Sequence, residues 1–210
     1  MHTGKAPDIA GLTGEHLLYS HPSVPVLLSK LFNLIIQCKH VPEGFTHSYI
    51  VPIPKIKDPR IRPMMILGCI AISPLMSKVF EHCILDRFST YFTSCEAQYC
   101  FKKGVGCRNA IHTVHTIVDK MTEGGNTVNI CATDLSKAFD KVNHRGLFTK
   151  LMKRHIPTKL LELLENWLSV SSACVKWVDS WSRVFMISSG VRQGSVLSPF
   201  LFAVLCRRHW

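Results

Sequence analysis

Apolar residues recur every three to four positions in several stretches of the chain, and this period predicts amphipathic helices. The pattern is most regular in Cys107–Met121, and Gly124-Gly125-Asn126 follows it as a helix-ending turn. In Pro74–Phe92 the proline stands at the entrance of the predicted helix, a position that suits its fixed backbone angle. Further helices are predicted at Val24–Lys39, around Leu147, Phe148, Leu151 and Met152, after Pro157 with Leu160, Leu161, Leu164, Trp167 and Leu168 on one side, and at Val196–Cys206.

Other stretches are rich in β-forming residues and predict strands. The apolar run Val128–Ala132 predicts a buried strand that ends at Asp134. Tyr49–Ile53 is a second candidate, which Pro52 confines to a sheet edge or a strand end. Cys174–Val178 and Arg183–Ser188 predict a hairpin that turns at Asp179-Ser180. Together the elements predict an α+β fold in which a small antiparallel sheet contains residues 128–134, has helices on one face and leaves one strand edge unpaired.

A carboxylate at the end of a buried strand is costly to desolvate unless a metal ion or a hydrogen-bond donor meets it. Asp134 is such a carboxylate, so a metal ion or a hydrogen-bond donor is expected beside it. The alternative is that Asp134 caps a helix or forms a salt bridge. A second acid, Asp140, follows a turn and is expected to cap the next helix.

The chain is strongly basic, with 25 lysines and arginines against 14 acids and a net charge of +11. This balance favours a polyanionic partner, although an ordinary basic domain has the same composition. The densest basic stretch is Leu135–Leu160, where Asp140 is the opposing acid, and it predicts a surface that follows phosphates. Its cations are Lys137, Lys141, Arg145, Lys150, Lys153, Arg154 and Lys159, and a separate basic loop holds Lys55, Lys57, Arg60 and Arg62.

The nine cysteines include no Cys-x-x-Cys pair, and the start of the chain lacks a signal-peptide pattern. We therefore expect reduced thiols and an intracellular protein of the cytoplasm or nucleus. No zinc site is expected, because the spacing of Cys95, Cys100, Cys107, His112 and His115 matches no common zinc motif. No membrane span is expected either, since the apolar run at residues 200–206 is far too short.

The order Asp134-x-x-x-Ala138-Phe139-Asp140 resembles the first catalytic motif of reverse transcriptases from non-LTR retrotransposons, the LINE-like and jockey-like elements. Further stretches resemble later or earlier motifs of that family in the family's order, between Gly4 and Ala203. They are Gly4–Pro7, Val51–Lys55, Ile72–Pro74, Ser77–Glu81, Gln98–Gly104 and Gly190–Pro199.

The resemblance implies a fingers-and-palm fold and two-metal nucleotidyl transfer with Mg²⁺. Asp134 would ligate metal together with the Leu135 carbonyl, and Lys55 would face the triphosphate. Phe139 would select deoxynucleotides, while Gln193 and Gly194 would line the nucleotide side of the cleft. The implied partners are an RNA template, an RNA–DNA hybrid or DNA, contacted by the basic stretch and by Lys102 and Lys103.

The resemblance also divides the chain into a lead segment (1–21), a fingers-like part (22–75), a partial palm (76–204) and a divergent tail (205–210). The family's Tyr-x-Asp-Asp motif and thumb do not occur in it, and Gly68 stands where the family has a fingers arginine. One carboxylate does not hold two Mg²⁺ ions, so we expect little or no polymerase activity from this chain. The alternatives are a non-catalytic nucleic-acid-binding remnant and a product without function.

Overall fold

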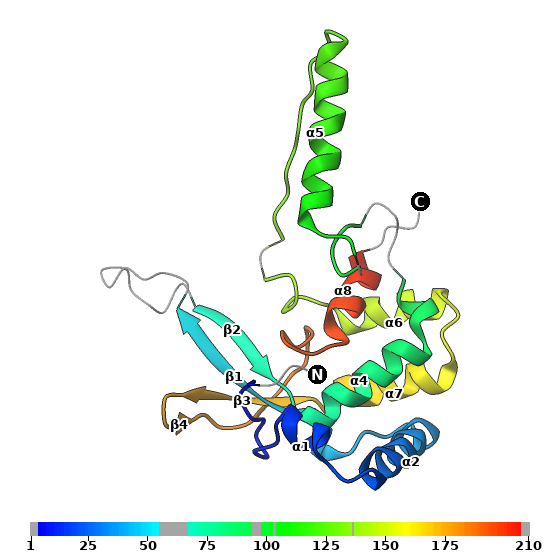
Figure 1. The fold of residues 1–210 in the computed structure, drawn as a ribbon, viewed down its shortest axis with the longest axis vertical. Helices are drawn as coiled ribbons and strands as arrows, with labels where there is room; N and C mark the ends of the chain where they lie inside the picture. Colours follow the sequence, from blue (N-terminus) through cyan, green and yellow to red (C-terminus); the bar gives the residue numbers. More distant parts are fainter. Residues whose placement is uncertain (1–3, 55–66, 94–97, 103, 136, 207–210) are drawn as a thin grey trace.

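The structure is a computed structural model that describes residues 4–54, 67–93, 98–102, 104–135 and 137–206. A body of packed helices carries a small twisted sheet on one side and one long helix that projects away from it (Figure 1). Among the described residues, no helix is both long enough and apolar enough to cross a membrane. The elements thus form an α+β fold, as the sequence predicts.

Five helices build the body, and their apolar stripes meet in one core. Phe80 lies at the centre of this core, stacked on Trp167 with 5.5 Å between ring centroids and tilted against Phe32 at 5.0 Å. The helices are α2 (Ser23–Cys38), α4 (Leu75–Arg87), α6 (His144–Lys153), α7 (Thr158–Ser169) and α8 (Ser198–Cys206), joined by the short α1 (Gly14–Leu18), α3 (Glu43–Thr46) and a 3₁₀ turn at Ser89–Phe92.

The periodicity located these helices correctly, with local exceptions. Met152, expected on the buried side of α6, is exposed, because α6 presents only Leu147 and Leu151 fully to the core. Leu163 of α7 is fully buried although the expected stripe omitted it. Asp140 does not cap α6: the cap is Asn143, whose side chain accepts a hydrogen bond from the Gly146 amide at 3.0 Å.

The sheet is formed by β1 (His47–Pro54), β2 (Leu67–Ile72), β3 (Ser172–Trp177), β4 (Ser180–Trp181) and β5 (Phe185–Met186). Its order is β2-β1-β3-β4, with β5 also paired to β3. The expectation of a purely antiparallel sheet was wrong, because β1 and β3 pair in parallel. Pro52 is accommodated because β3 pairs only with residues 47–50 of β1, so the proline has β2 alone as a neighbour.

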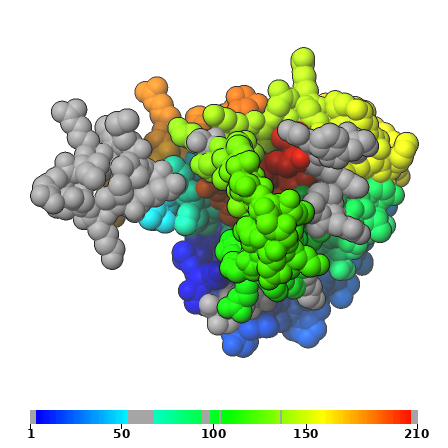
Figure 2. All heavy atoms as spheres, turned by 90° about the horizontal axis from the view of Figure 1, so that it is seen from above, coloured from blue at the N-terminus to red at the C-terminus, as the bar shows by residue number. Residues whose placement is uncertain are grey.

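The projecting helix is α5 (Cys107–Glu123), none of whose residues is buried. Viewed from above, its far end is covered by no other element (Figure 2). The chain returns beside it through residues 126–135 in an extended conformation (Figure 1).

The expectation of a buried strand at Val128–Ala132 was therefore wrong. A strand needs a partner for its backbone groups, and within the described residues no β pairing involves this segment. Ile130 is 67% exposed and Asp134 is also exposed. We expected residues 128–134 to form a strand of the sheet with one unpaired edge, but this segment lies outside the sheet.

Candidate functional site

The loop from Gly190 to Ser195 joins the helical body to the sheet. The Gly190 amide donates to the Val142 carbonyl at 2.9 Å, and the Val191 amide donates to the Phe139 carbonyl at 2.8 Å. A side chain on Gly190 would meet the Asp140 carbonyl oxygen at 2.8 Å, and its φ of +84° also favours glycine. These contacts attach the loop to the turn that follows Asp134, so two segments about 50 residues apart in the sequence lie together.

The other end of the loop is attached to β2. The Ala71 amide donates to the Gln193 carbonyl at 2.8 Å. A Cβ atom on Gly194 would overlap the Ala71 carbonyl oxygen, and the φ of Gly194 is +106°. Gly194 therefore allows the loop backbone to lie directly against the backbone of β2.

Glu81 fixes the loop from the side of α4. This carboxylate is 1% exposed, and its Oε2 accepts from the Ser195 hydroxyl at 2.6 Å and the Leu197 amide at 2.8 Å. The Ser77 hydroxyl donates to Oε1 at 3.2 Å. Burial lowers the pKa of the Arg192 guanidinium, and the charge of Glu81 acts in the opposite direction. Glu81 thus satisfies buried donors from the loop and balances the charge of a loop arginine.

Sequence reasoning recorded Glu81 only as part of a family motif and missed this role. The signal was present, because the buried positions of α4 are Ser77, Phe80, Glu81 and Ile84, the i, i+3, i+4, i+7 pattern of a core-facing stripe. An acid on such a stripe must find donors inside the protein.

The lead segment holds the start of α4 in a similar way. Asp8 accepts from the Leu75 amide, the first residue of α4, at 2.8 Å, and from the Leu12 amide at 2.8 Å. The Tyr49 hydroxyl donates to the Pro7 carbonyl at 2.9 Å. Burial, with a smaller effect of Asp8, raises the pKa of Tyr49. The Gly4–Pro7 motif therefore lies at the junction of α4 and β1.

A cavity of about 150 Å³ opens between the sheet and the Gly190–Gln193 part of the loop. Asp140 and Gln193 line it. The remaining wall residues are mostly apolar and come from the sheet, from the segment after β5 and from the loop itself. They are Ser48 and Ile50 of β1, Cys69 and Ala71 of β2, and Phe185, Ile187, Ser189, Gly190, Val191 and Arg192.

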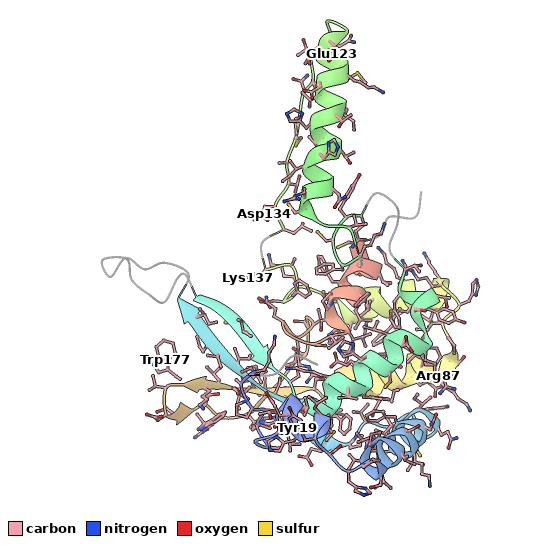
Figure 3. The ribbon with its side chains drawn as sticks, in the orientation of Figure 1. Tyr19, Arg87, Glu123, Asp134, Lys137 and Trp177 are labelled. Carbon is pink, nitrogen blue, oxygen red and sulfur yellow. The ribbon has the colours of Figure 1, made fainter. Side chains whose placement is uncertain are left out.

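Asp134 and Leu135 lie outside this cavity. Both are exposed on the extended segment beside α5 (Figure 3). Phe139 is half-buried between two rings, stacked on Phe202 at 5.0 Å and edge-on to Phe101 at 6.2 Å. Among the described residues, no group of three or more His, Cys, Asp or Glu side chains is arranged to hold a metal ion. A two-metal centre therefore does not fit the described residues by themselves, because Asp134 offers a single carboxylate there.

The cations of the basic stretch have different environments. Lys137, Lys141, Arg145, Lys153 and Lys159 are exposed. Lys150 donates to the Leu205 carbonyl, and Arg154 donates to the Tyr91 and Thr93 carbonyls at 2.8 and 2.7 Å. Lys102 is half-exposed, whereas Lys55 and Lys103 lie outside the described residues. Four of the five exposed cations, Lys137, Lys141, Arg145 and Lys153, lie on the turn and on α6, and we call these four the basic face, whereas Lys159 lies on α7.

A model of the family "Reverse transcriptase (RNA-dependent DNA polymerase)" matches residues 64–208. The match covers more than half of the chain, including the loop and the turn that the loop contacts. The chain belongs to the reverse transcriptase family. This confirms the resemblance stated from its motifs.

Relatives of this reverse transcriptase chain are RNA-directed DNA polymerases of non-LTR elements. It is 29% identical over 187 residues to the RNA-directed DNA polymerase from mobile element jockey of Drosophila melanogaster, covering 84% of the chain and 20% of the relative. It is 27% identical over 184 residues to the probable RNA-directed DNA polymerase from transposon X-element of the same species, covering 84% and 20%. It is 26% identical over 204 residues to the probable RNA-directed DNA polymerase from transposon BS of Drosophila melanogaster, and this match covers 95% of the chain and 22% of the relative. The chain spans about a fifth of the length of these relatives.

Proposed function

We propose that this chain is a fingers-and-palm portion of the reverse transcriptase domain of a non-LTR retrotransposon. Residues 22–75 would form the fingers-like part and residues 76–204 the palm-like part, with 1–21 as a lead. The observation that carries the proposal is the junction at Gly190–Ser195, where three family motifs meet. The loop contacts the turn after Asp134, is held by Glu81 of the Ser77–Glu81 motif, and lies with β1 and β2 around one cavity.

Nucleic acid is the partner that this arrangement fits best. The four residues of the basic face are exposed, and the chain carries a net charge of +11. Arg145 and Lys153 lie about 80° apart around α6, so both can reach one phosphate backbone. The basic face would contact backbone phosphates without reading sequence, and the cavity beside Gln193 would take the nucleotide.

Reverse transcriptases generally use divalent metal ions, and we propose Mg²⁺ for this one. Asp134, together with the Leu135 carbonyl, would contribute one set of oxygen ligands. A two-metal site needs further carboxylates. For that reason we propose that these 210 residues alone bind nucleic acid but do not extend a primer.

A salt titration of binding tests the nucleic-acid part of the proposal. A fluorescently labelled RNA–DNA hybrid should bind the purified chain at low salt, with an affinity that falls steeply as salt rises. Replacing the four residues of the basic face by alanine should reduce the slope of log K against log salt by up to about 3.6, at roughly 0.7–0.9 per lost phosphate contact. Lys30→Ala on α2 removes one exposed charge from the opposite end of the body and should leave the slope unchanged.

Two kinds of result would contradict the proposed binding of nucleic acid. Absence of binding at low salt would remove the proposed function. Salt-independent binding, or the same slope in the wild type and the four-fold variant, would show that the basic face does not contact phosphate.

A further inference from the structure

The register of the sheet assigns its residues to two faces. Ile50 lies beside Ala71 on β2 and beside Val175 on β3, and Ala173 lies opposite Phe185. Side chains alternate along a strand, so Ala173, Val175 and Trp177 share one face of β3. Because Ile50, Ala71 and Phe185 line the cavity beside the loop, this is the cavity face, and it continues along β3 to Trp177.

Two aromatic rings are open to solvent on this face. Phe185 is 44% exposed at the cavity, and Trp177 is 53% exposed at the outer end of the hairpin (Figure 3). The four-residue step from Ala173 to Trp177 separates them by about 13 Å along the strand. Within the described part of the chain, no other aromatic ring stacks on either of them.

The tryptophan on the opposite face is engaged by the protein itself. Trp181 meets the Tyr49 ring edge-on at 5.6 Å, and the Lys176 ammonium lies 5.2 Å from the Trp181 ring centroid. The hairpin thus holds one ring in contact with its own sheet and leaves the cavity-face rings available.

We propose that Trp177 and Phe185 form a stacking platform for the bases of a single-stranded nucleic acid that leads into the cavity. The proposal rests on the proposed function and adds the residues that hold the unpaired strand. Flat rings flanked by cations suit unpaired bases, which have accessible π faces beside a charged backbone. Exposed Arg183 supplies a cation in the hairpin, and the chain as a whole is positively charged, whereas Lys176 lies over Trp181 on the opposite face and Asp179 is the acid at the turn.

Fluorescence anisotropy with labelled oligo(rU) tests the platform. Trp177→Ala and Phe185→Ala should each weaken binding about 5- to 100-fold, the range of losing one base–aromatic stack. Trp177→Phe should retain most of the affinity, whereas Trp177→Leu, which keeps an apolar side chain without a π face, should bind as weakly as Trp177→Ala. Tyr19→Ala removes an 80% exposed ring at the end of α1, outside the hairpin, and should change nothing.

Two further readouts separate stacking from charge and from folding. The salt slope of Trp177→Ala should equal that of the wild type, because no phosphate contact is lost. Binding of an RNA–DNA hybrid, whose bases are already stacked and paired, should be unaffected in the same variant. That second result also shows that the variant is folded.

Wild-type affinity for oligo(rU) in Trp177→Ala and Phe185→Ala would overturn the platform while leaving the proposed function standing. Wild-type affinity in Trp177→Leu would overturn it as well, because it would show a merely apolar contact. If the wild type binds neither oligo(rU) nor the hybrid at low salt, the proposed function and the platform fail together.

Discussion

Replacing Glu81 with alanine would leave the Ser195 hydroxyl, the Leu197 amide and the Ser77 hydroxyl without the buried acceptor that they share. Each buried donor that loses its partner costs about 1–3 kcal/mol, although relaxation and water entry reduce the sum. Arg192 would also lose the favourable charge of Glu81. Breaking a buried charged interaction from one side costs about 3–5 kcal/mol. We expect a loss of about 3–5 kcal/mol for Glu81→Ala, a large part of the about 5–15 kcal/mol typical of a folded domain.

Glu81→Gln provides a graded comparison. With its amide oxygen at the place of Oε2, glutamine still accepts both short hydrogen bonds, but its amide nitrogen replaces Oε1, the acceptor of the Ser77 hydroxyl, and the charge is gone. We expect a loss of about 1–3 kcal/mol. Glu165→Ala, which removes an exposed glutamate from α7, is the matched control and should stay within about 0.5 kcal/mol of the wild type.

Urea unfolding followed by far-ultraviolet circular dichroism measures these differences, provided that the slope of the transition stays constant. A double-mutant cycle of Glu81→Ala with Ser195→Ala should give a coupling of about 0.5–3 kcal/mol, because the two side chains touch. A Glu81→Ala protein that unfolds with the same midpoint as Glu165→Ala would refute the reasoning. A coupling of zero would refute the assigned contact.

Gly194→Ala should destabilise the protein by at least about 2 kcal/mol, since the φ of +106° and the nearby Ala71 carbonyl both exclude a side chain. Gly104→Ala, at a φ of +78° in open space, is the control that carries backbone strain without the overlap, and an equal loss in both variants would contradict the assigned overlap. Burial raises the pKa of the Cys174 thiol, so the unfolded chain ionises this group first. Its contribution to stability is complete below about pH 8.5 and should be lost as the pH rises through the raised value. The urea midpoint should therefore fall more at alkaline pH in the wild type than in Cys174→Ala, and identical pH dependence would contradict this.

The helices were predictable because their stripes depend on local spacing. Leu147 and Leu151 of α6 and Leu160 and Leu164 of α7 are fully buried where the 3.6-residue period places them. The cap at Asn143 was also readable, because its partner Gly146 lies only three residues away.

Features that depend on distant partners were not predictable in the same way. The run at 128–132 has the composition of a strand, but whether it becomes one depends on a neighbour that no local pattern supplies. The parallel pairing of β1 with β3 joins residues about 125 apart, so a single sequence gives no register for it.

In the candidate site, too, the contacts between distant segments could not be predicted from the sequence. Gln193 lines a cavity, and its role on the nucleotide side stays a prediction from the motif resemblance. The motif resemblance did not predict that Phe139 packs between Phe101 and Phe202, or that Glu81 holds the loop. These contacts join segments that lie far apart in the sequence.

Primer extension tests the central claim most directly. The purified 210-residue chain is incubated with oligo(dT) annealed to poly(rA), thymidine triphosphate and either Mg²⁺ or Mn²⁺. The account predicts that the chain binds the primer–template at low salt but adds no nucleotide, because among the residues that the structure describes Asp134 is not joined by the further carboxylates that two metal ions need. Mg²⁺-dependent extension that disappears in Asp134→Ala would contradict it, since the 210 residues would then suffice for catalysis.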